Sequence, residues 1–404
     1  MNRKAYEAYC RAYQKAYFVA MHALKWEEPQ LLRGAGSVKQ LPALIKDLGY
    51  KNVLVVTDSV LHQKLHLLDA MLEEMKNCEI AYVVYDGVQP NPTIDNVEKA
   101  RALYAGNGCE AIVAFGGGSP MDCAKAAGAR IARPDKEVPQ LRGQLKVLKR
   151  IPMLFAVPTT AGTGSETTIA AVVSNPITHE KNAINDPVLR PKYAVLDPEL
   201  TIGLPPHITS TTGMDALTHA VEAYIGGSNT KETSEQARKA VKLIFGYLEK
   251  AYHDGKDLEA RENMLVGSYY AGLAFTRAYV GYVHAIAHNL GGMYGTPHGL
   301  ANAVILPYVL EYFGETCHKQ LAELAEVAGL ETDGKTDAEK AQLFIDAIKQ
   351  MKKDMNIPEK FDMIKEEDID LIADRALLEG NPLYPVPKIM DKAECVALIH
   401  SMMA

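Results

Sequence analysis

The amino-acid sequence predicts an N-terminal α/β domain with a doubly wound, mostly parallel sheet, followed by an all-helical C-terminal domain. Three observations carry this prediction. The 404 residues are more than one compact core usually holds. Short apolar runs alternate with helical patterns from about residue 30 to residue 200. After Leu204-Pro205-Pro206 the strand signal stops, and helix formers dominate to the end of the chain.

The α/β domain is predicted over residues 29–204. Several of its apolar runs are β-branched throughout rather than alternating, as expected for strands of a parallel sheet covered on both faces. The predicted strands are 52–56, 80–84, 111–115, 153–157 and 193–196. Between them, residues 92–106 and 121–131 have helical spacing, and this βαβ order implies a doubly wound sheet.

The helical domain is predicted over residues 205–404. Its helices should break near residues 226–227, 253–255, 291–299, 329–334 and 380–382. Residues 1–28 are predicted to be a separate helical extension, because several apolar residues recur there at helical spacing. That stripe consists of Tyr6, Cys10, Tyr13, Tyr17 and Ala20. We expect it to pack on the body of the protein or on a second subunit.

Composition excludes several classes of function. A net charge of −7 and a pI near 6.0 argue against a surface for nucleic acid or anionic membranes. No apolar run is long enough to span a bilayer. The six cysteines are scattered, without a CxxC pair, which is typical of reduced thiols in a cytoplasmic protein.

A glycine triplet follows the predicted strand 111–115, in the sequence GGGSPMD over residues 116–122. Glycines let the backbone turn sharply and approach a ligand without a Cβ in the way. Their N–H groups, with Ser119 and the start of the next helix, could bind a pyrophosphate. Many strand-to-helix turns carry glycines for steric reasons alone, so the triplet by itself favours neither interpretation.

Two further segments make a dinucleotide site more plausible. Asp58 follows the strand 52–56, where a carboxylate can accept both hydroxyls of an adenosine ribose and repel a 2′-phosphate, which favours NAD over NADP. A helix N-cap at Asp58 is an equally good interpretation. The sequence PTTAGTGSE over residues 158–166 follows another strand, and its small hydroxyl residues suit a narrow, polar cleft.

The helical half contains a group of residues suited to a divalent metal. Asp215 and His219 are four residues apart, as are His284 and His288, so each pair should project from one face of a helix. His298 lies in a turn beyond them. A lone histidine on an apolar helix is more often a core residue, but this combination favours a metal site. The spacing leaves open whether His284 and His288 both bind the metal or one stands beside it.

From about residue 30 to the C-terminus the chain resembles the iron-containing (group III) alcohol dehydrogenase family. The resemblance rests on Asp58, QPNPT (89–93), GGGSPMD, PTTAGTGSE, GMDALTH (213–219) and GYVHAIAH…TPHGLANA (281–303). It implies a Rossmann-like nucleotide-binding domain, a helical metal-binding domain with a catalytic cleft between them, and a dehydroquinate synthase-like architecture.

Position by position, the resemblance implies roles for individual residues. The metal ligands would be Asp215, His219, His284 and His298, and the metal is usually Fe(II) and sometimes Zn(II). His288 would stay unligated near the nicotinamide and the substrate, where it is the expected proton relay. Gly117, Gly118 and Ser119 would hold the pyrophosphate and Asp58 the ribose. The remainder of the NAD site would be lined by Asn91, Thr159, Thr160, Thr163 and Lys181.

The expected activity is metal-dependent hydride transfer between NAD(H) and a small-molecule substrate, a short-chain primary alcohol or aldehyde, including diols. The alternative is a dehydroquinate-synthase-like lyase, but few Lys or Arg residues lie near the ligand motifs to bind a phosphorylated substrate. Apolar Ile169 and Ala170, and GNPLYP (380–385) in place of the NPR common in relatives, leave the substrate open. A homodimer is expected from the resemblance and from the prevalence of symmetric oligomers.

Overall fold

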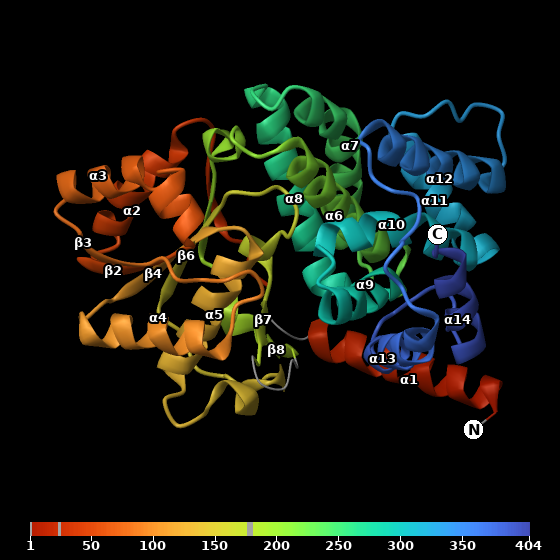
Figure 1. Ribbon diagram of the computed structural model, residues 1–404, viewed down its shortest axis with the longest axis horizontal. Coiled ribbons are helices and arrows are strands. Elements are labelled where there is room, and N and C mark those ends of the chain that lie inside the picture. The colour runs from red at the N-terminus through yellow and green to blue at the C-terminus, as the bar shows by residue number, and fades with distance from the viewer. Residues whose placement is uncertain (1, 23–25, 176–180) are drawn as a thin grey trace. The chain divides into compact units, whose positions relative to one another are not determined.

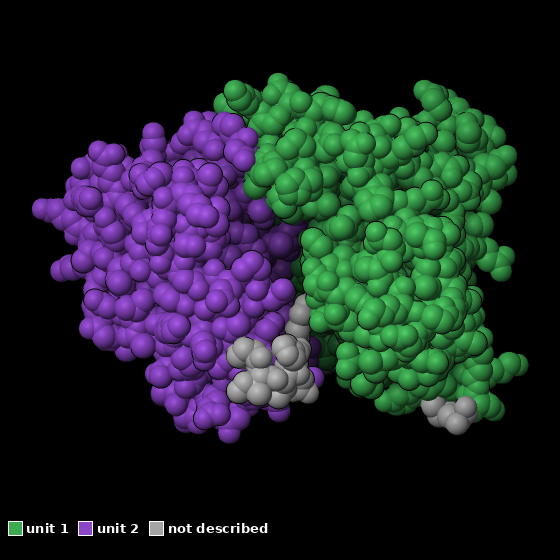
Figure 2. Space-filling view, in the orientation of Figure 1, with its two compact units in different colours: residues 1–25, 204–404 green, residues 26–203 purple. Residues whose placement is uncertain are grey.

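The computed structural model describes residues 2–22, 26–175 and 181–404 of the chain (Figure 1). It divides into two compact units, Trp26–Gly203 on the one hand and Met1–Lys25 with Leu204–Ala404 on the other (Figure 2). The first unit is α/β and the second is helical, so the predicted fold class is confirmed.

The α/β unit is built on a six-stranded sheet in the order β1-β9-β6-β4-β2-β3, in which every pairing is parallel. Its strands are β1 (Gln30–Arg33), β2 (Asn52–Val56), β3 (Ala81–Tyr85), β4 (Ala111–Gly116), β6 (Met153–Pro158) and β9 (Tyr193–Leu196). β2 and β9 have the predicted bounds, and the other three predicted strands are displaced or extended by one residue. β1 was not predicted because its short sequence, QLLR, is half polar.

Helices cover both faces of this sheet (Figure 1). Alternate residues of β2 enter two separate cores, which explains its unbroken apolar sequence. Val53 and Val55 pack with α2 (Leu41–Asp47) and α3 (Asp69–Asn77). On the opposite face, Leu54 and Val56 pack with α4 (Ile94–Gly106) and α5 (Gly118–Ala132).

A second sheet of three short strands was not predicted. It consists of β5 (Gly143–Gln144), β8 (Lys181–Asn185) and β7 (Ala170–Ser174), with β7 and β8 antiparallel. Its strands have two to five residues, and β7 alternates between buried and partly exposed positions. Such short segments carry too little periodicity to be separated from loops by sequence alone.

The helical unit begins with α1 (Arg3–His22), within the extension predicted over 1–28. Cys10, Gln14 and Met21 are buried, whereas Tyr13 is 40% exposed, so the stripe predicted from the tyrosines is wrong at Tyr13. Of that stripe, the side chain of Ala20 lies outside the described part of the chain. The buried face of α1 therefore includes a polar glutamine that the sequence pattern gave no reason to select.

Residues Leu204–Ala404 form nine further helices. They are α6 (Pro206–Ile225), α7 (Lys231–His253), α8 (Leu258–Ala278), α9 (Tyr282–Tyr294), α10 (His298–Phe313), α11 (His318–Val327), α12 (Asp337–Asp354), α13 (Ile369–Gly380) and α14 (Lys392–Ser401). Across the residues that the structure describes, none of the helices is both long and apolar enough to cross a membrane.

The helix break predicted over residues 291–299 is narrower than expected. Gly291 and Gly292 lie inside α9, which continues to Tyr294. The helix ends at Gly295, whose φ of +69° places it in the left-handed region that glycine adopts readily. Pro297 then precedes α10. The two internal glycines are tolerated because tertiary packing overrides their low helix propensity.

Gly213 marks a close approach of α6, α7 and α8. A Cβ at this position would overlap Leu248 Cδ1 and lie 3.0 Å from Met264 Cε. Both of those side chains are buried, so neither can move into solvent. The tight packing fixes the helix α6, which carries the first half of the predicted metal site.

Gly213→Ala is therefore expected to lower the free energy of unfolding by about 1–3 kcal/mol through overpacking. Gly246→Ala on α7 is the matched control, because a Cβ there meets nothing within 4 Å and should add up to about 1 kcal/mol of helix stability. Urea unfolding followed by circular dichroism measures both. Equal stabilities of the two variants would contradict the packing argument.

Candidate metal and nucleotide sites

Three acidic or imidazole side chains lie along one face of α6. Asp215, His219 and Glu222 are spaced by four and three residues, which is the spacing of neighbours on a helix surface. All three are buried, with relative exposures of 2%, 5% and 3%. Buried groups of this kind require partners, so this face of α6 must meet complementary groups from other elements.

Those groups come from α9 and α10. His284 on α9 and His298 at the start of α10 each present a ring nitrogen to the α6 face. One ligand atom from each of Asp215, His219, His284 and His298 lies within 4.8 Å of the others. The four residues predicted as metal ligands from two distant stretches of sequence are thus brought together at one point.

The side chain of Asn302, one turn after His298 on α10, contacts three members of this group. Its Nδ2 lies 2.6 Å from Asp215 Oδ1 and 3.1 Å from Nε2 of both His284 and His298. An amide has only two N–H groups, so it cannot donate to three acceptors at once. The acceptors converge on a common point, and a buried set of carboxylate and imidazole donors fits a divalent cation.

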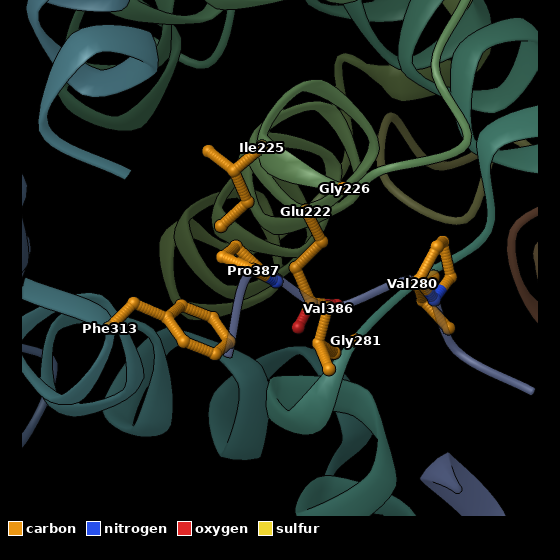
Figure 3. Close-up of a pocket in the computed structure, with 9 residues that line it drawn as sticks. Glu222, Ile225, Gly226, Val280, Gly281, Phe313, Val386 and Pro387 are labelled. Carbon is orange, nitrogen blue, oxygen red and sulfur yellow. The ribbon is translucent and has the colours of Figure 1, made fainter. Parts of the chain in front are cut away.

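Sequence reasoning did not select Glu222, although it lies beside the metal group. One of its oxygens is 2.6 Å from His284 Nδ1, and the other accepts the N–H of Val283 at 2.8 Å. Figure 3 shows Glu222 beside Gly281 and Val386 in a small pocket. A carboxylate that accepts from Nδ1 leaves Nε2 of His284 as the metal-facing atom. Glu222 follows His219 by three residues on α6, and this spacing is the sequence signal that could have identified it.

Burial shifts the pKa values of this pair. It raises the pKa of Glu222, whereas hydrogen bonds from the backbone of residues 281, 283 and 284 lower that pKa and favour the carboxylate. It also lowers the pKa of His284 well below its ordinary value, as do the neighbouring histidines His219, His298 and His288. His284 is therefore neutral, which is the form that can bind a metal.

His288 lies beside the metal group without belonging to it. Its Nδ1 is 2.6 Å from Glu379 Oε1 on α13, and its ring stacks on His298 with centroids 5.2 Å apart. The side chain is 32% exposed, in contrast to 3% for His284. Among the described residues, the two histidines of α9 thus occupy different environments.

In the α/β unit, the two glycine-containing segments pack against each other. Gly117 lies so close to Thr160 that a Cβ would meet Thr160 Oγ1 at 3.3 Å, and a Cβ on Gly118 would meet Thr163 Cγ2 at 3.1 Å. The N–H of Thr159 donates to the carbonyl of Gly116 at 3.2 Å. The predicted pyrophosphate loop and the segment 158–166 are therefore in contact at the carboxyl ends of β4 and β6.

A third segment contacts the predicted pyrophosphate loop through Ser119. The N–H of Asn91, which has a φ of +57°, donates to Ser119 Oγ at 3.3 Å. Asp58 follows β2, the parallel neighbour of β4, but its Oδ1 accepts the N–H groups of Val60 and Leu61. The capping interpretation of Asp58 is thus observed. Lys181 begins β8, and its side chain lies outside the described part of the chain.

Lys125 on α5 is a buried residue that sequence reasoning did not select. Its Nζ donates to the carbonyl oxygens of Ser165 and Ala170 and to Thr168 Oγ1, at 2.7 to 3.0 Å. Burial lowers the pKa of its amine to about 8, and nearby Asp122 opposes the shift. The lysine fixes the segment that follows Thr163 to the helix that begins at Gly118.

Comparison with known proteins identifies the family. Residues 29–198 match the family described as "Iron-containing alcohol dehydrogenase", and residues 209–403 match "Fe-containing alcohol dehydrogenase family, C-terminal". The chain is also 39% identical over 362 residues to "Alcohol dehydrogenase 4" of Schizosaccharomyces pombe, covering 88% of this chain and 84% of that protein. The chain belongs to the iron-containing alcohol dehydrogenase family.

Other members of the family support the assignment across almost the whole chain. The "1,3-propanediol dehydrogenase" of Klebsiella pneumoniae is 41% identical over 356 residues, covering 87% of this chain and 92% of that protein. Among solved structures, "Alcohol dehydrogenase from Oenococcus oeni" superposes with a TM-score of 0.90 at 36% identity, covering 94% of this chain and 100% of that one. This iron-containing alcohol dehydrogenase is thus an NAD-linked oxidoreductase of alcohols and aldehydes, and the lyase alternative is not favoured.

Gly281→Ala is expected to weaken the metal site through Glu222. A Cβ at residue 281 would lie 2.7 Å from Glu222 Oε1, so the carboxylate that holds His284 through its other oxygen must move. Loss of such an outer partner lowers metal affinity by about 10–100-fold. Competition with a chromogenic chelator for Zn(II) measures the change. Gly292→Ala on the same helix should have no effect, because a Cβ there meets nothing within 4 Å, and equal losses in both variants would refute the role of Glu222.

Proposed function

We propose that the chain transfers hydride between NAD(H) and a short-chain primary alcohol or the corresponding aldehyde, with the help of one divalent cation. The observation that carries the proposal is the convergence of four donor side chains within 4.8 Å in the helical unit. Asp215, His219, His284 and His298 would hold the cation. When bound, it would act as a Lewis acid on the alcohol or carbonyl oxygen.

The protein residues around this site have separate tasks. Glu222 keeps the proton of His284 on Nδ1, so that Nε2 faces the site. Burial of Asp215 and His284 excludes water from one side of the group, whereas the side chain of His298 is 39% exposed and leaves the other side open to a substrate. This arrangement fixes three donors firmly and keeps one edge accessible.

The metal in the cell is proposed to be Fe(II), with Zn(II) as the alternative. Three imidazoles and one carboxylate suit several divalent first-row metals, and intrinsic affinity would not favour iron. The choice of iron rests on the family to which the chain belongs. Metal analysis of protein purified without air would distinguish Fe(II) from Zn(II).

The nucleotide site is proposed at the carboxyl ends of β2, β4 and β6. Backbone N–H groups of Gly117 and Gly118, with Ser119, would bind the pyrophosphate of NAD. The carboxylate of Asp58 would bind the adenosine ribose while it also accepts the N–H groups of Val60 and Leu61. The remainder of the site would be formed by Asn91, Thr159, Thr160, Thr163 and Lys181. NAD would exchange hydride with the substrate at its nicotinamide ring.

His288 is proposed to carry the proton that accompanies hydride transfer. Its Nδ1 is held by Glu379, so Nε2 is the ring atom that would take up or release the proton. Partial exposure gives this imidazole access to solvent, which the buried His284 lacks. Histidine is also the side chain that most often transfers protons in enzymes.

The substrate class, the compartment and the assembly complete the proposal. Relatives include a "Lactaldehyde reductase" of Escherichia coli and an "NAD-dependent methanol dehydrogenase" of Bacillus methanolicus, so small alcohols and aldehydes are the substrates to test first. Ile169 is apolar and buried, which fits a short uncharged substrate. The six cysteines are all unpaired, as suits the reducing cytoplasm. The proposed assembly is a homodimer.

A panel of short alcohols and diols, assayed with NAD and with Fe(II) or Zn(II), tests the activity. We expect NADH formation from the native chain. His298→Ala should lower kcat/KM by more than about 100-fold, since loss of a direct ligand should exceed the effect of losing an outer partner. His253→Ala, at the exposed end of α7, should be unaffected. A native chain that binds metal and NAD but forms no NADH with any alcohol would reject the proposal.

Asp58→Asn is expected to relax the preference for NAD over NADP. The amide oxygen can still accept the N–H groups of Val60 and Leu61, while the charge that repels a 2′-phosphate is gone. We expect the ratio of kcat/KM for NADP to that for NAD to rise by about tenfold, the equivalent of roughly 1.4 kcal/mol. An unchanged ratio would remove Asp58 from the nucleotide site.

A further inference from the structure

A chain of hydrogen bonds leads from His288 to a part of the sequence that the proposed reaction does not use. Nδ1 of His288 lies 2.6 Å from Glu379 Oε1. The hydroxyl of Tyr384 donates to the same oxygen at 2.9 Å. Glu379 is near the end of α13 and Tyr384 is in the segment that follows, so neither belongs to the helices that carry the four converging donors.

We propose that Glu379 is the positioning residue for His288, held in place by Tyr384. The inference rests on the proposed role of His288 in proton transfer. A neutral imidazole carries one proton, and a carboxylate that accepts from Nδ1 keeps the proton there. Nε2 then presents its lone pair on the opposite side of the ring, where it can accept a proton. Glu379 would hold Nδ1 of His288 as Glu222 holds Nδ1 of His284, but the pair of Glu379 and His288 is partly exposed.

Tyr384 keeps Glu379 in this orientation. Its side chain is buried, and burial together with the nearby Glu379 carboxylate raises the pKa of the phenol well above its ordinary value. The hydroxyl therefore remains a hydrogen-bond donor throughout the range in which the enzyme would work. The tyrosine hydroxyl thus contributes to holding the carboxylate of Glu379, which is 31% exposed, in the orientation that meets His288.

The N-terminal helix α1 supports the segment that carries Tyr384. Gln14 Nε2 donates to the carbonyl of Tyr384 at 2.7 Å, and Arg11 donates to the carbonyls of Val386 and Pro387 at 2.6 and 2.8 Å. The intervening carbonyl of residue 385 accepts the N–H of Gly227 at 2.6 Å. Four consecutive carbonyl groups are therefore fixed, three of them by side chains of α1. We assign α1 this supporting role.

The tautomer of His288 gives a direct test that does not depend on turnover. In Zn(II)-loaded protein with ¹⁵N-labelled histidine, at a pH where the ring is neutral, the signals lost in His288→Ala identify this residue. We expect the Nδ1–H form in the native chain and in Glu379→Gln, whose amide oxygen can still accept. Glu379→Met, which cannot accept, should shift His288 toward the Nε2–H form. An unchanged tautomer in Glu379→Met would overturn the proposal.

Kinetics then separate positioning from a general structural effect. Glu379→Met should lower kcat/KM by about 10–100-fold without loss of bound metal, and Glu379→Gln should restore most of the activity. In a His288→Ala background, Glu379→Met should have almost no further effect, because the two residues act as a unit. Equal losses in both backgrounds would show that Glu379 does not act through His288. Asp374→Asn on the same helix is the control, since Asp374 is exposed and pairs with Lys392.

The contribution of α1 is tested by Gln14→Ala. It should lower kcat/KM less than Glu379→Met does and should lose its effect in the His288→Ala background. Tyr9→Ala, on the exposed side of α1, should be neutral. A loss in Gln14→Ala that persists without His288 would refute the supporting role. If the native chain oxidises no alcohol, the proposed function fails, whereas the tautomer measurement still decides the role of Glu379.

Discussion

The structure of the helical unit depends on one electrostatic constraint, the convergence of a carboxylate and three imidazoles at a mostly buried point. Acceptor atoms that face one another with little water between them are unfavourable unless a cation or a donor lies between them. Residues outside the group of four donors hold those donors in place. Gly213 lets α6 pack tightly, Glu222 holds His284, and Gly281 leaves space for the Glu222 carboxylate. Each of these residues is explained by the donor group and by no local property of its own segment.

The α/β unit meets a different constraint, which is the close approach of threonine side chains to the backbone of a glycine loop. Gly117 and Gly118 contact Thr160 and Thr163 so closely that side chains larger than hydrogen would displace them. The parallel order of β2, β4 and β6 brings these loops to the same edge of the sheet, where ligands of doubly wound folds bind. Lys125 adds a buried cation that ties the loop after Thr163 to α5.

Local patterns in the sequence were sufficient to predict the parallel sheet and the helical half. The choice of the four converging residues came from the family resemblance, because spacing alone left His284 and His288 undecided. Four-residue spacing placed Asp215 with His219, and unbroken apolar runs revealed the buried strands. Glu222, Asn302 and Glu379 were not selected, because their residue types are ordinary on helices and only tertiary contacts give them a role. The break predicted over residues 291–299 is narrower than expected for a related reason, since packing continues α9 through Gly291 and Gly292 to Tyr294.

The two histidines of α9 show how one local pattern can serve two purposes. His284 and His288 are four residues apart, and in each the Nδ1 atom is held by a carboxylate from another helix at 2.6 Å. The difference lies in burial, since the side chains of His284 and Glu222 are 3% and 1% exposed and those of His288 and Glu379 are 32% and 31% exposed. A buried imidazole cannot exchange protons with solvent and suits a fixed ligand, whereas an accessible one suits proton transfer. The same carboxylate–imidazole pair would therefore fix a metal ligand where it is buried and orient a proton carrier where it is exposed to solvent.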